Sequence, residues 1–377
     1  MSDVGVAAAP RVQNTGRFAG VGGVMPWFLV PLIMGFGLLA MAIQALPNDG
    51  ETLWGVLSSP DLMRARTLPA VAAILPSWFT LTLAGLAMGM MFFLMASGLT
   101  LVFGLMDVIN FGHGAFVSVG AFVGVSVLAG LSGWTSSPEI ALNLAAIGFA
   151  IMAAMAVTGA AGLVFERVIV RPVYGAHLKQ ILVTVGGLII AEQLIHVIWG
   201  PAEIYLSRPE SLKGAIVFKG VALETYRLLA VAIGVVIFAL MSLVLKYTRI
   251  GLIVRAGVQD GEMVEAMGYR LRRVFIGVFV AGSALAGLGG VLWALYQEVV
   301  TAHMGADLMV LVFVVVIIGG LGSVTGCFLG AMMIGLVQNY TAFVEPKLAL
   351  VSTITVLVLV LLWRPTGMMS RSGGRQS

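Results

Sequence analysis

Charged side chains are scarce in this chain of 377 residues. Asp, Glu, Lys and Arg together make up 10% of the sequence, whereas 60% of the residues are hydrophobic. Soluble domains carry about 25% charged residues and about 45–50% apolar ones, so a fold surrounded by water would leave much of this apolar surface exposed. The composition therefore excludes an ordinary soluble domain and indicates that lipid surrounds most of the protein.

The sequence also lacks the motifs of several enzyme classes. It contains neither GxxxxGK[ST], the P-loop that binds ATP, nor the HExxH segment of a zinc protease. Cys327 is the single cysteine, so no intrachain disulfide forms, and the four histidines (His113, His177, His196 and His303) are scattered rather than clustered. We therefore expect no metal, no cofactor and no catalytic residues, and an integral-membrane enzyme has no polar cluster to support it.

Ten apolar runs approach the length of about 20 residues that a helix needs to cross a bilayer. The runs are continuous rather than alternating, which argues against a β-barrel. We predict an all-α, polytopic integral membrane protein with about ten transmembrane helices. The predicted spans are residues 26–46, 77–105, 108–131, 140–165, 180–199, 226–246, 274–296, 308–320, 324–341 and 348–363.

Lys and Arg are distributed unevenly between the two sides of this arrangement. With both termini in the cytoplasm, 14 of the 21 Lys and Arg residues lie on the inner side. This excess follows the positive-inside rule, so we predict a cytoplasmic N-terminus and a cytoplasmic C-terminus. The topology also accounts for the net charge of +4 without a nucleic-acid partner.

The first apolar run has two interpretations. Arg11 and Arg17 precede it and Ala40-Met41-Ala42 lies near its end, as in a cleavable signal peptide. The run is long for such a peptide, and we interpret residues 26–46 as a retained transmembrane helix.

Ten spans divide into two groups of five that begin on opposite sides of the membrane, as in an inverted repeat. The third span of each group is interrupted: the earlier one opens with Asp107-Val-Ile-Asn110-Phe-Gly-His113-Gly114, and the later one closes with Gly319-Gly320-Leu-Gly322-Ser323. Broken helices at matching places in two halves indicate a substrate pathway. The alternative is that the glycines only permit close helix packing and that the polar side chains only form hydrogen bonds with backbone groups left free at the helix break. The pathway candidates are Asn110, His113, Gly114, Gly320, Gly322 and Ser323.

One further polar pair falls inside a predicted span. Glu192 and His196 are four residues apart, which places them on the same face of a helix and within reach of a hydrogen bond. Ionisable residues in a membrane are costly and indicate function by default. The pair either lines the pathway or forms a buried structural contact.

The longest cytoplasmic connection, residues 247–273, exceeds the roughly 2–8 residues of a simple link between helices. Asp260 is a candidate N-cap of a short helix and Gly268 a candidate end. We expect Met263, Val264 and Met267 on one side of this helix. It either docks on a cytosolic partner or lies on the lipid surface, held by the flanking residues Arg255, Arg270, Arg272 and Arg273.

Four stretches of this chain resemble the permease family of branched-chain amino-acid ABC transporters. They are residues 248–260 with 265–268, residues 98–104 with 109–114, Glu166-Arg167 with Arg171-Pro172, and residues 319–323 with Arg364-Pro365-Thr-Gly367. They follow the family's order over about 80–370. We therefore predict a permease domain at residues 76–370, a cytoplasmic tail at 371–377, and an N-terminal extension at 1–75 with one extra transmembrane helix.

The resemblance implies a non-enzymatic transport subunit of the bacterial inner membrane. Its implied partners are a second homologous permease, two cytosolic ATPase subunits and a periplasmic substrate-binding protein. The implied substrates are branched-chain amino acids; related permeases move urea, short amides or aromatic acids. In the family the cytoplasmic loop contacts the ATPase, so the implied coupling residues are Arg255, Asp260, Glu265, Ala266, Met267 and Gly268. An ion-coupled secondary transporter is the alternative, but only Glu192 offers it a midplane carboxylate.

Overall fold

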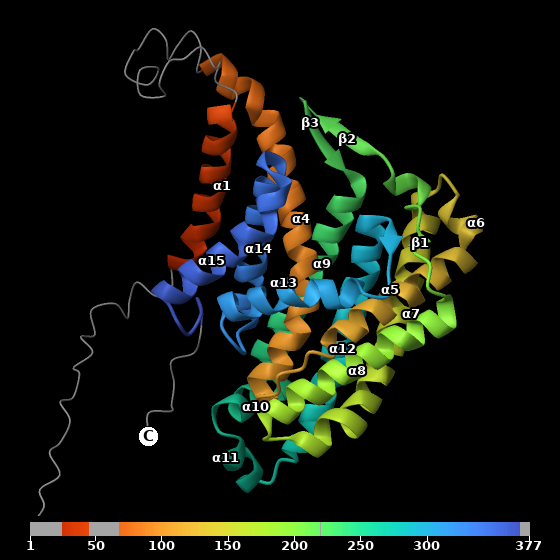
Figure 1. Ribbon diagram of the computed structural model, residues 1–377, viewed down its shortest axis with the longest axis vertical. Helices are drawn as coiled ribbons and strands as arrows, with labels where there is room; N and C mark the ends of the chain where they lie inside the picture. Colours follow the sequence, from red (N-terminus) through yellow and green to blue (C-terminus); the bar gives the residue numbers. More distant parts are fainter. Residues whose placement is uncertain (1–24, 45–67, 219, 370–377) are drawn as a thin grey trace, which may run out of the picture.

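The computed structural model describes residues 25–44, 68–218 and 220–369, and within these ranges the chain is predominantly helical (Figure 1). Eight of the described helices are long and apolar enough to cross a membrane, and the shorter apolar segments Phe28–Met41 and Met304–Gly319 accompany them. Together they correspond to the ten predicted spans. The prediction of an all-α polytopic membrane protein is confirmed.

The membrane helices keep the predicted order but differ at some of their ends. They are α1 (Met25–Gln44), α4 (Leu68–Met106), α5 (His113–Gly130), α7 (Ile140–Phe165), α8 (His177–Trp199), α9 (Thr225–Tyr247), α12 (Leu271–Gln297), α13 (Met304–Gly319), α14 (Val324–Val344) and α15 (Ala349–Trp363). Helix α4 begins well before predicted residue 77 and continues through Pro76, so the predicted boundary at residues 75/76 falls inside it. The predicted tail, 371–377, lies outside the described residues.

Shorter elements connect the membrane helices. They are α6 (Ser132–Thr135), the π-helical turn η2 (Glu166–Val170), the 3-10 turns η3 (Arg171–Val173), η4 (Glu210–Leu212) and η5 (Pro346–Leu348), and the helices α10 (Arg249–Gln259) and α11 (Gly261–Ala266). The strands β1 (Ile204–Tyr205) and β4 (Val299–Val300) pair antiparallel, as do β2 (Ala215–Phe218) and β3 (Val221–Glu224). The β2–β3 hairpin and the pair α10–α11 lie at opposite ends of the molecule (Figure 1).

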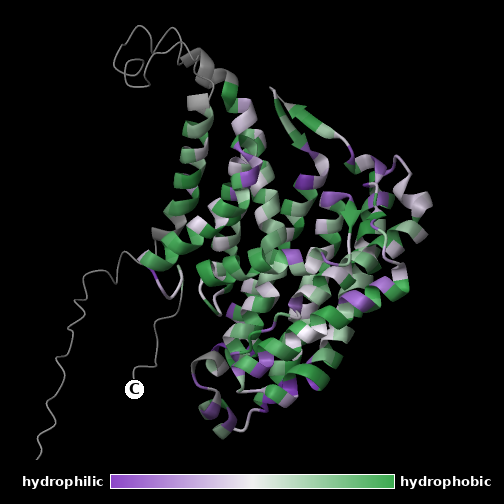
Figure 2. Ribbon diagram, in the orientation of Figure 1, coloured by the Kyte–Doolittle hydropathy of each residue, from purple (hydrophilic) through white to green (hydrophobic). Residues whose placement is uncertain are grey.

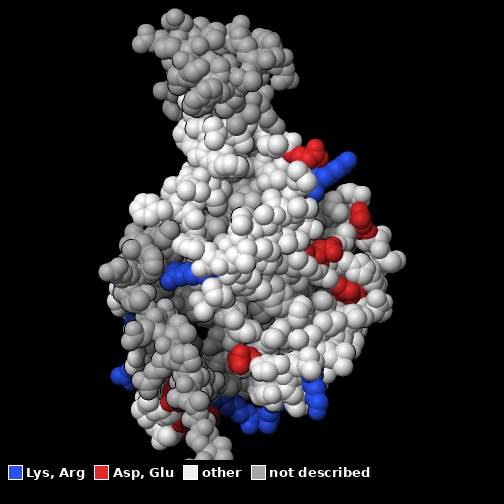
Figure 3. All heavy atoms as spheres, turned by 60° about the vertical axis from the view of Figure 1, so that its left-hand side comes forward, with Lys and Arg blue, Asp and Glu red and all other residues white. Residues whose placement is uncertain are grey.

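Hydropathy follows the same division. Hydrophobic residues dominate the long helices, and hydrophilic residues gather towards the two ends (Figure 2). On the face drawn in Figure 3, basic side chains gather at the lower end, below a broad uncharged surface. This distribution suits a bundle that crosses a lipid bilayer with its two ends in water.

The core repeats one packing scheme in each half of the bundle. Helix α4 packs against α14, and helix α12 packs against α7. Helices α4 and α12 are the second spans of the two groups of five, and α7 and α14 are the fourth. The second span of each group therefore packs against the fourth span of the other group, as expected for an inverted repeat. Where α4 and α12 cross, a Cβ atom on Gly282 would lie 2.9 Å from the carbonyl oxygen of Gly98. The two backbones therefore touch, which glycine permits.

Candidate functional site

The first interruption separates α4 from α5. Asp107 adopts a left-handed backbone conformation with φ of 50°, which ends the long helix. Asn110 is completely buried, and neither atom of its side-chain amide has a hydrogen-bond partner in the described part of the chain. His113 is also buried, and its Nε2 lies 2.9 Å from the Met95 carbonyl oxygen, to which it donates a hydrogen bond. In this conformation the two polar side chains are closed off from solvent.

Gly114 lies where the two interrupted spans meet. A Cβ atom on Gly114 would approach the carbonyl oxygen of Gly305, near the start of α13, to 2.6 Å. The remaining pathway candidates follow the other end of α13. At a rise of about 1.5 Å per residue, Gly305 and Gly320 are roughly 20 Å apart along α13. Gly114 therefore lies at the opposite end of this short helix from Gly320, Gly322 and Ser323, and the six predicted residues do not form a single cluster.

The second interruption is a turn between α13 and α14. Gly320 and Gly322 adopt left-handed conformations, with φ of 95° and 78°, which favour glycine. The Ser323 hydroxyl accepts a hydrogen bond of 3.1 Å from the Gly326 amide and so caps α14. The segment after α15 covers this turn, because the amides of Met368 and Met369 donate to the carbonyls of Ile318 and Gly319.

The turn meets the cytoplasmic loop at a small cavity. Gly322 and Ser323 line a cavity of about 320 Å³ together with Arg255 of α10. The Arg255 guanidinium donates hydrogen bonds to the carbonyls of Gly251 and Lys246, at 3.3 and 3.4 Å, and so ties α10 to the end of α9. Sequence reasoning assigned Arg255 to the loop surface, whereas the structure places it beside the second interruption.

The loop contains two helices rather than one. The predicted short helix is α11: the Asp260 carboxylate accepts a hydrogen bond of 2.9 Å from the Met263 amide, and Gly268, with φ of 85°, follows the helix. Helix α10 was not predicted, although Thr248 supplies a cap for it by accepting a hydrogen bond from the Gly251 amide at 3.1 Å. That threonine was the available sequence signal.

The exposed face of α11 differs from the predicted one. Met263 and Met267 are 57% and 59% exposed, and Glu265 and Ala266 are exposed as well. Val264 is 2% exposed, so the prediction that it shares a side with the two methionines is wrong. Residues 263 and 264 are successive on the helix and point about 100° apart. The loop therefore exposes a small apolar surface formed by the two methionines.

Glu192 is held by a residue that the sequence did not associate with it. Its Oε2 lies 3.2 Å from Nδ1 of His303, just before α13, and its side chain is buried. The His196 ring lies edge-on to the His303 ring, with centroids 5.7 Å apart, and its buried Nδ1 has no hydrogen-bond partner in the described residues. His303 thus joins the predicted pair across more than 100 positions of sequence, which helical spacing alone does not reveal.

A second buried carboxylate lies where α7 ends. The Tyr174 hydroxyl donates a hydrogen bond of 2.7 Å to Oε1 of Glu166, which is completely buried. Burial, together with the neighbouring carboxylate, raises the pKa of Tyr174 above its ordinary value. The phenol therefore keeps its proton and remains a donor. Among the described residues, no group of three or more His, Cys, Asp or Glu side chains is placed to hold a metal ion.

The described bundle of apolar helices, with an inverted repeat and two interrupted spans, defines a multi-pass membrane protein. Comparison with known proteins identifies the family of this membrane protein. Residues 81–363 match the family described as the branched-chain amino acid transport system permease component. The chain belongs to this family.

Individual relatives agree with that assignment. The chain is 29% identical over 297 residues to the high-affinity branched-chain amino acid transport system permease protein BraD of Pseudomonas aeruginosa, a match that covers 76% of this chain and 94% of BraD. It is 28% identical over 300 residues to the permease protein LivH of Escherichia coli K12, with the same coverage. A probable LivH permease of Methanocaldococcus jannaschii is 25% identical over 257 residues, covering 66% of this chain and 76% of that protein. No solved structure matches.

Proposed function

We propose that this chain is the transmembrane permease subunit of a binding-protein-dependent ABC importer that moves branched-chain or related hydrophobic amino acids into the cytoplasm. The observation that carries the proposal is the family match over residues 81–363, which spans almost the whole membrane bundle. The names of the relatives support the substrate class. Urea, short amides and aromatic acids are the alternative substrates of the same importer class.

The proposed partners are a second homologous permease, two cytosolic ATPase subunits that hydrolyse the ATP, and a periplasmic binding protein. Helix α11 is the proposed ATPase contact, because it lies at one end of the molecule and exposes Met263 and Met267. Exposed apolar side chains on a polar loop favour a protein interface. With α11 in the cytoplasm, the β2–β3 hairpin lies on the periplasmic side, and both termini face the cytoplasm of a bacterial inner membrane.

Asn110 and His113 are proposed to line the substrate path, together with Gly114 and with Gly320, Gly322 and Ser323 at the far end of α13. A buried amide without a partner is costly in a membrane protein, and a path that admits water or a zwitterion would satisfy it. In this conformation the His113 ring donates its hydrogen bond to the Met95 carbonyl. Opening of the path would exchange that carbonyl for water or substrate.

An uptake experiment with competitors tests the function. The chain is reconstituted in vesicles with its partner permease, ATPases and binding protein, and ATP-dependent uptake of labelled leucine is measured against unlabelled valine, urea, acetamide and phenylacetate. Competition by valine alone is the expected result. Competition by urea or acetamide but not by valine would contradict the proposed substrate class. Uptake without ATP would contradict the proposal that the chain belongs to an ATP-driven importer.

A further inference from the structure

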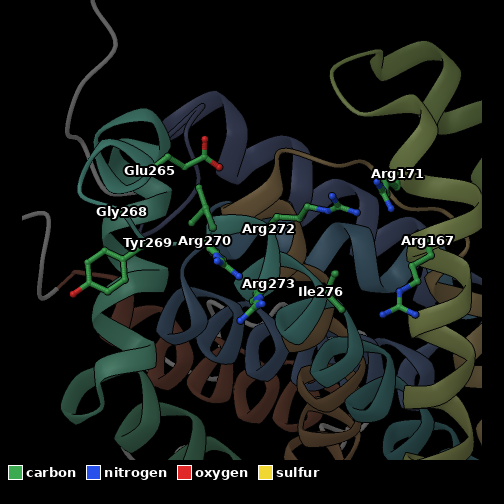
Figure 4. Close-up of a pocket in the computed structure, with 10 residues that line it drawn as sticks. Arg167, Arg171, Glu265, Gly268, Tyr269, Arg270, Arg272, Arg273 and Ile276 are labelled. Carbon is green, nitrogen blue, oxygen red and sulfur yellow. The ribbon is translucent and has the colours of Figure 1, made fainter.

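Five arginines from two separate segments surround one cavity near α11 (Figure 4). Arg167 and Arg171 come from the turns η2 and η3 after α7, whereas Arg270, Arg272 and Arg273 lie at the start of α12. The cavity has a volume of about 890 Å³. Among its lining residues Glu265 is the one acidic side chain, so the cavity is strongly basic.

The arginines of this basic cavity lack a partner among the described residues. All five are exposed, and within the described part of the chain none forms an ion pair or hydrogen bond through its guanidinium. Like charges gathered around one space repel one another. An anion shared among them, above all a phosphate with several acceptor oxygens, would be stabilised by charge-assisted hydrogen bonds.

An apolar groove begins where the basic cavity ends. Arg273 lines both spaces, and the groove continues past Val274 and Gly277 of α12 to Leu240 and Val244 of α9. Its volume is about 630 Å³. Leu240 and Val244 belong to a membrane-spanning helix and are 52% and 41% exposed. The groove therefore opens at the level of the lipid chains.

We propose that the basic cavity and the apolar groove together bind one anionic phospholipid, with its phosphate among the arginines and an acyl chain along the groove. This site goes beyond the proposed transport activity. An acidic protein segment would pair the arginines but leave the groove empty. A second permease would cover the groove but leave the arginines unpaired. A phospholipid satisfies both, and anionic headgroups are attracted to basic sites at the cytoplasmic leaflet.

Lipid binding to the full chain, purified in detergent, tests the proposal. Native mass spectrometry compares retention of dioleoylphosphatidylglycerol with that of zwitterionic dioleoylphosphatidylcholine, and free glycerol 3-phosphate serves as competitor. We expect at least about tenfold stronger retention of the anionic lipid, since each basic residue near the headgroup contributes about a factor of five. Glycerol 3-phosphate should displace it poorly, because it has no acyl chain to occupy the groove.

Variants separate the two parts of the site. Arg167→Gln and Arg273→Gln should each weaken retention of the anionic lipid about fivefold, and Arg167→Lys should retain most of it. Arg249→Gln, an exposed arginine of α10 outside the cavity, is the control. Ala281→Trp fills the groove and should weaken both lipids, whereas Ala160→Trp, an exposed alanine of α7, should not. If a variant in one part of the site does not fold, lipid retention by the variants in the other part still tests the proposal.

Three results would overturn the proposal. Equal retention of the two lipids would mean that the arginines do not select the headgroup. Displacement by equimolar glycerol 3-phosphate would reduce the site to one for free anions. Loss of the preference when the second permease is present would show that a protein, not lipid, covers the groove.

Discussion

At the scale of single residues, Asn110 and His113 combine burial with polarity. In the ranges that the structure describes, the Asn110 amide has no partner, and His113 donates to one backbone carbonyl. In water such groups cost little, but in a membrane bundle they must be satisfied by protein, water or ligand. A site that a passing zwitterion uses only briefly fits this description better than a tight binding site.

Cysteine substitution tests whether these positions open during transport. Asn110→Cys and His113→Cys, each with Cys327 replaced, should react slowly with a hydrophilic thiol reagent at rest, because both positions are buried. Trapping the assembled importer with nucleotide should clearly change the rate at which these cysteines react with the reagent. Ser97, buried on α4, offers a control cysteine position that should stay slow. If 110 and 113 stay inert in every trapped state, these residues are packing and not pathway.

Asp260 sets the start of α11 through its hydrogen bond to the Met263 amide. Asp260→Ala should destabilise the short helix by about 1 kcal/mol and lower substrate-stimulated ATP hydrolysis in the assembled complex. Asp260→Asn keeps a capping side chain and should retain most of the stimulation. Equal loss in both variants would mean that the charge of Asp260, rather than the cap, matters.

At the scale of elements, the crossing of α4 and α12 is limited by backbone contact. Gly282→Val places side-chain atoms against the Gly98 carbonyl, which cannot move aside as a flexible side chain would. We expect a loss of about 1–3 kcal/mol in the free energy of unfolding, measured as a lower Tm in detergent. Gly148→Val on α7, where nothing lies within 4 Å of the added Cβ, should change Tm little. Equal shifts would show that the crossing is not tightly packed.

Helix α1 lies outside the family match but packs on the bundle. It contacts α4 and α14, and the Trp78 indole donates a hydrogen bond of 2.9 Å to the Met34 carbonyl. A chain shortened to begin just before Leu68, which keeps α4 whole, should retain uptake but unfold at a lower temperature. Trp78→Phe in the full chain isolates the hydrogen bond. Loss of uptake in a shortened chain that still assembles would contradict the prediction that α1 is dispensable for transport.

The sequence predicted elements better than it predicted contacts. Bilayer thickness fixes the length of an apolar helix, so the ten spans were readable from composition along the chain. Helix α10 was missed because its amphipathic surface has neither that length nor a strong apolar run. Residues 68–76 lay outside the predicted span at 77–105, yet α4 begins at Leu68 and continues through Pro76.

The candidate site shows the same limit. Spacing along one helix placed Glu192 next to His196, whereas the approach of His303, the residue before α13, to Glu192 depends on the tertiary fold. The five arginines of the basic cavity were readable as markers of topology, but their convergence depends on how α7 and α12 pack. The cap Asp260 was different, because a cap acts within a few residues of its own position.

At the scale of the whole molecule, the bundle has two unlike ends and one repeated core. The packing of α4 on α14 and of α12 on α7 gives the core a symmetry that its ends lack. One end carries a hairpin, and the other carries α10, α11 and the basic cavity. An importer needs such polarity, because it receives substrate on one side and energy on the other.

The central claim is that ATP hydrolysis drives this permease through α11. The most direct measurement is substrate-stimulated ATP hydrolysis by the complete importer in vesicles, with the intact chain and with Glu265-Ala266-Met267 replaced by Gly-Ser-Gly. The account predicts strong stimulation by substrate-loaded binding protein with the intact chain. It predicts loss of that stimulation with the variant, although the variant still inserts and assembles. Normal stimulation in the variant would contradict the account and place the ATPase contact elsewhere.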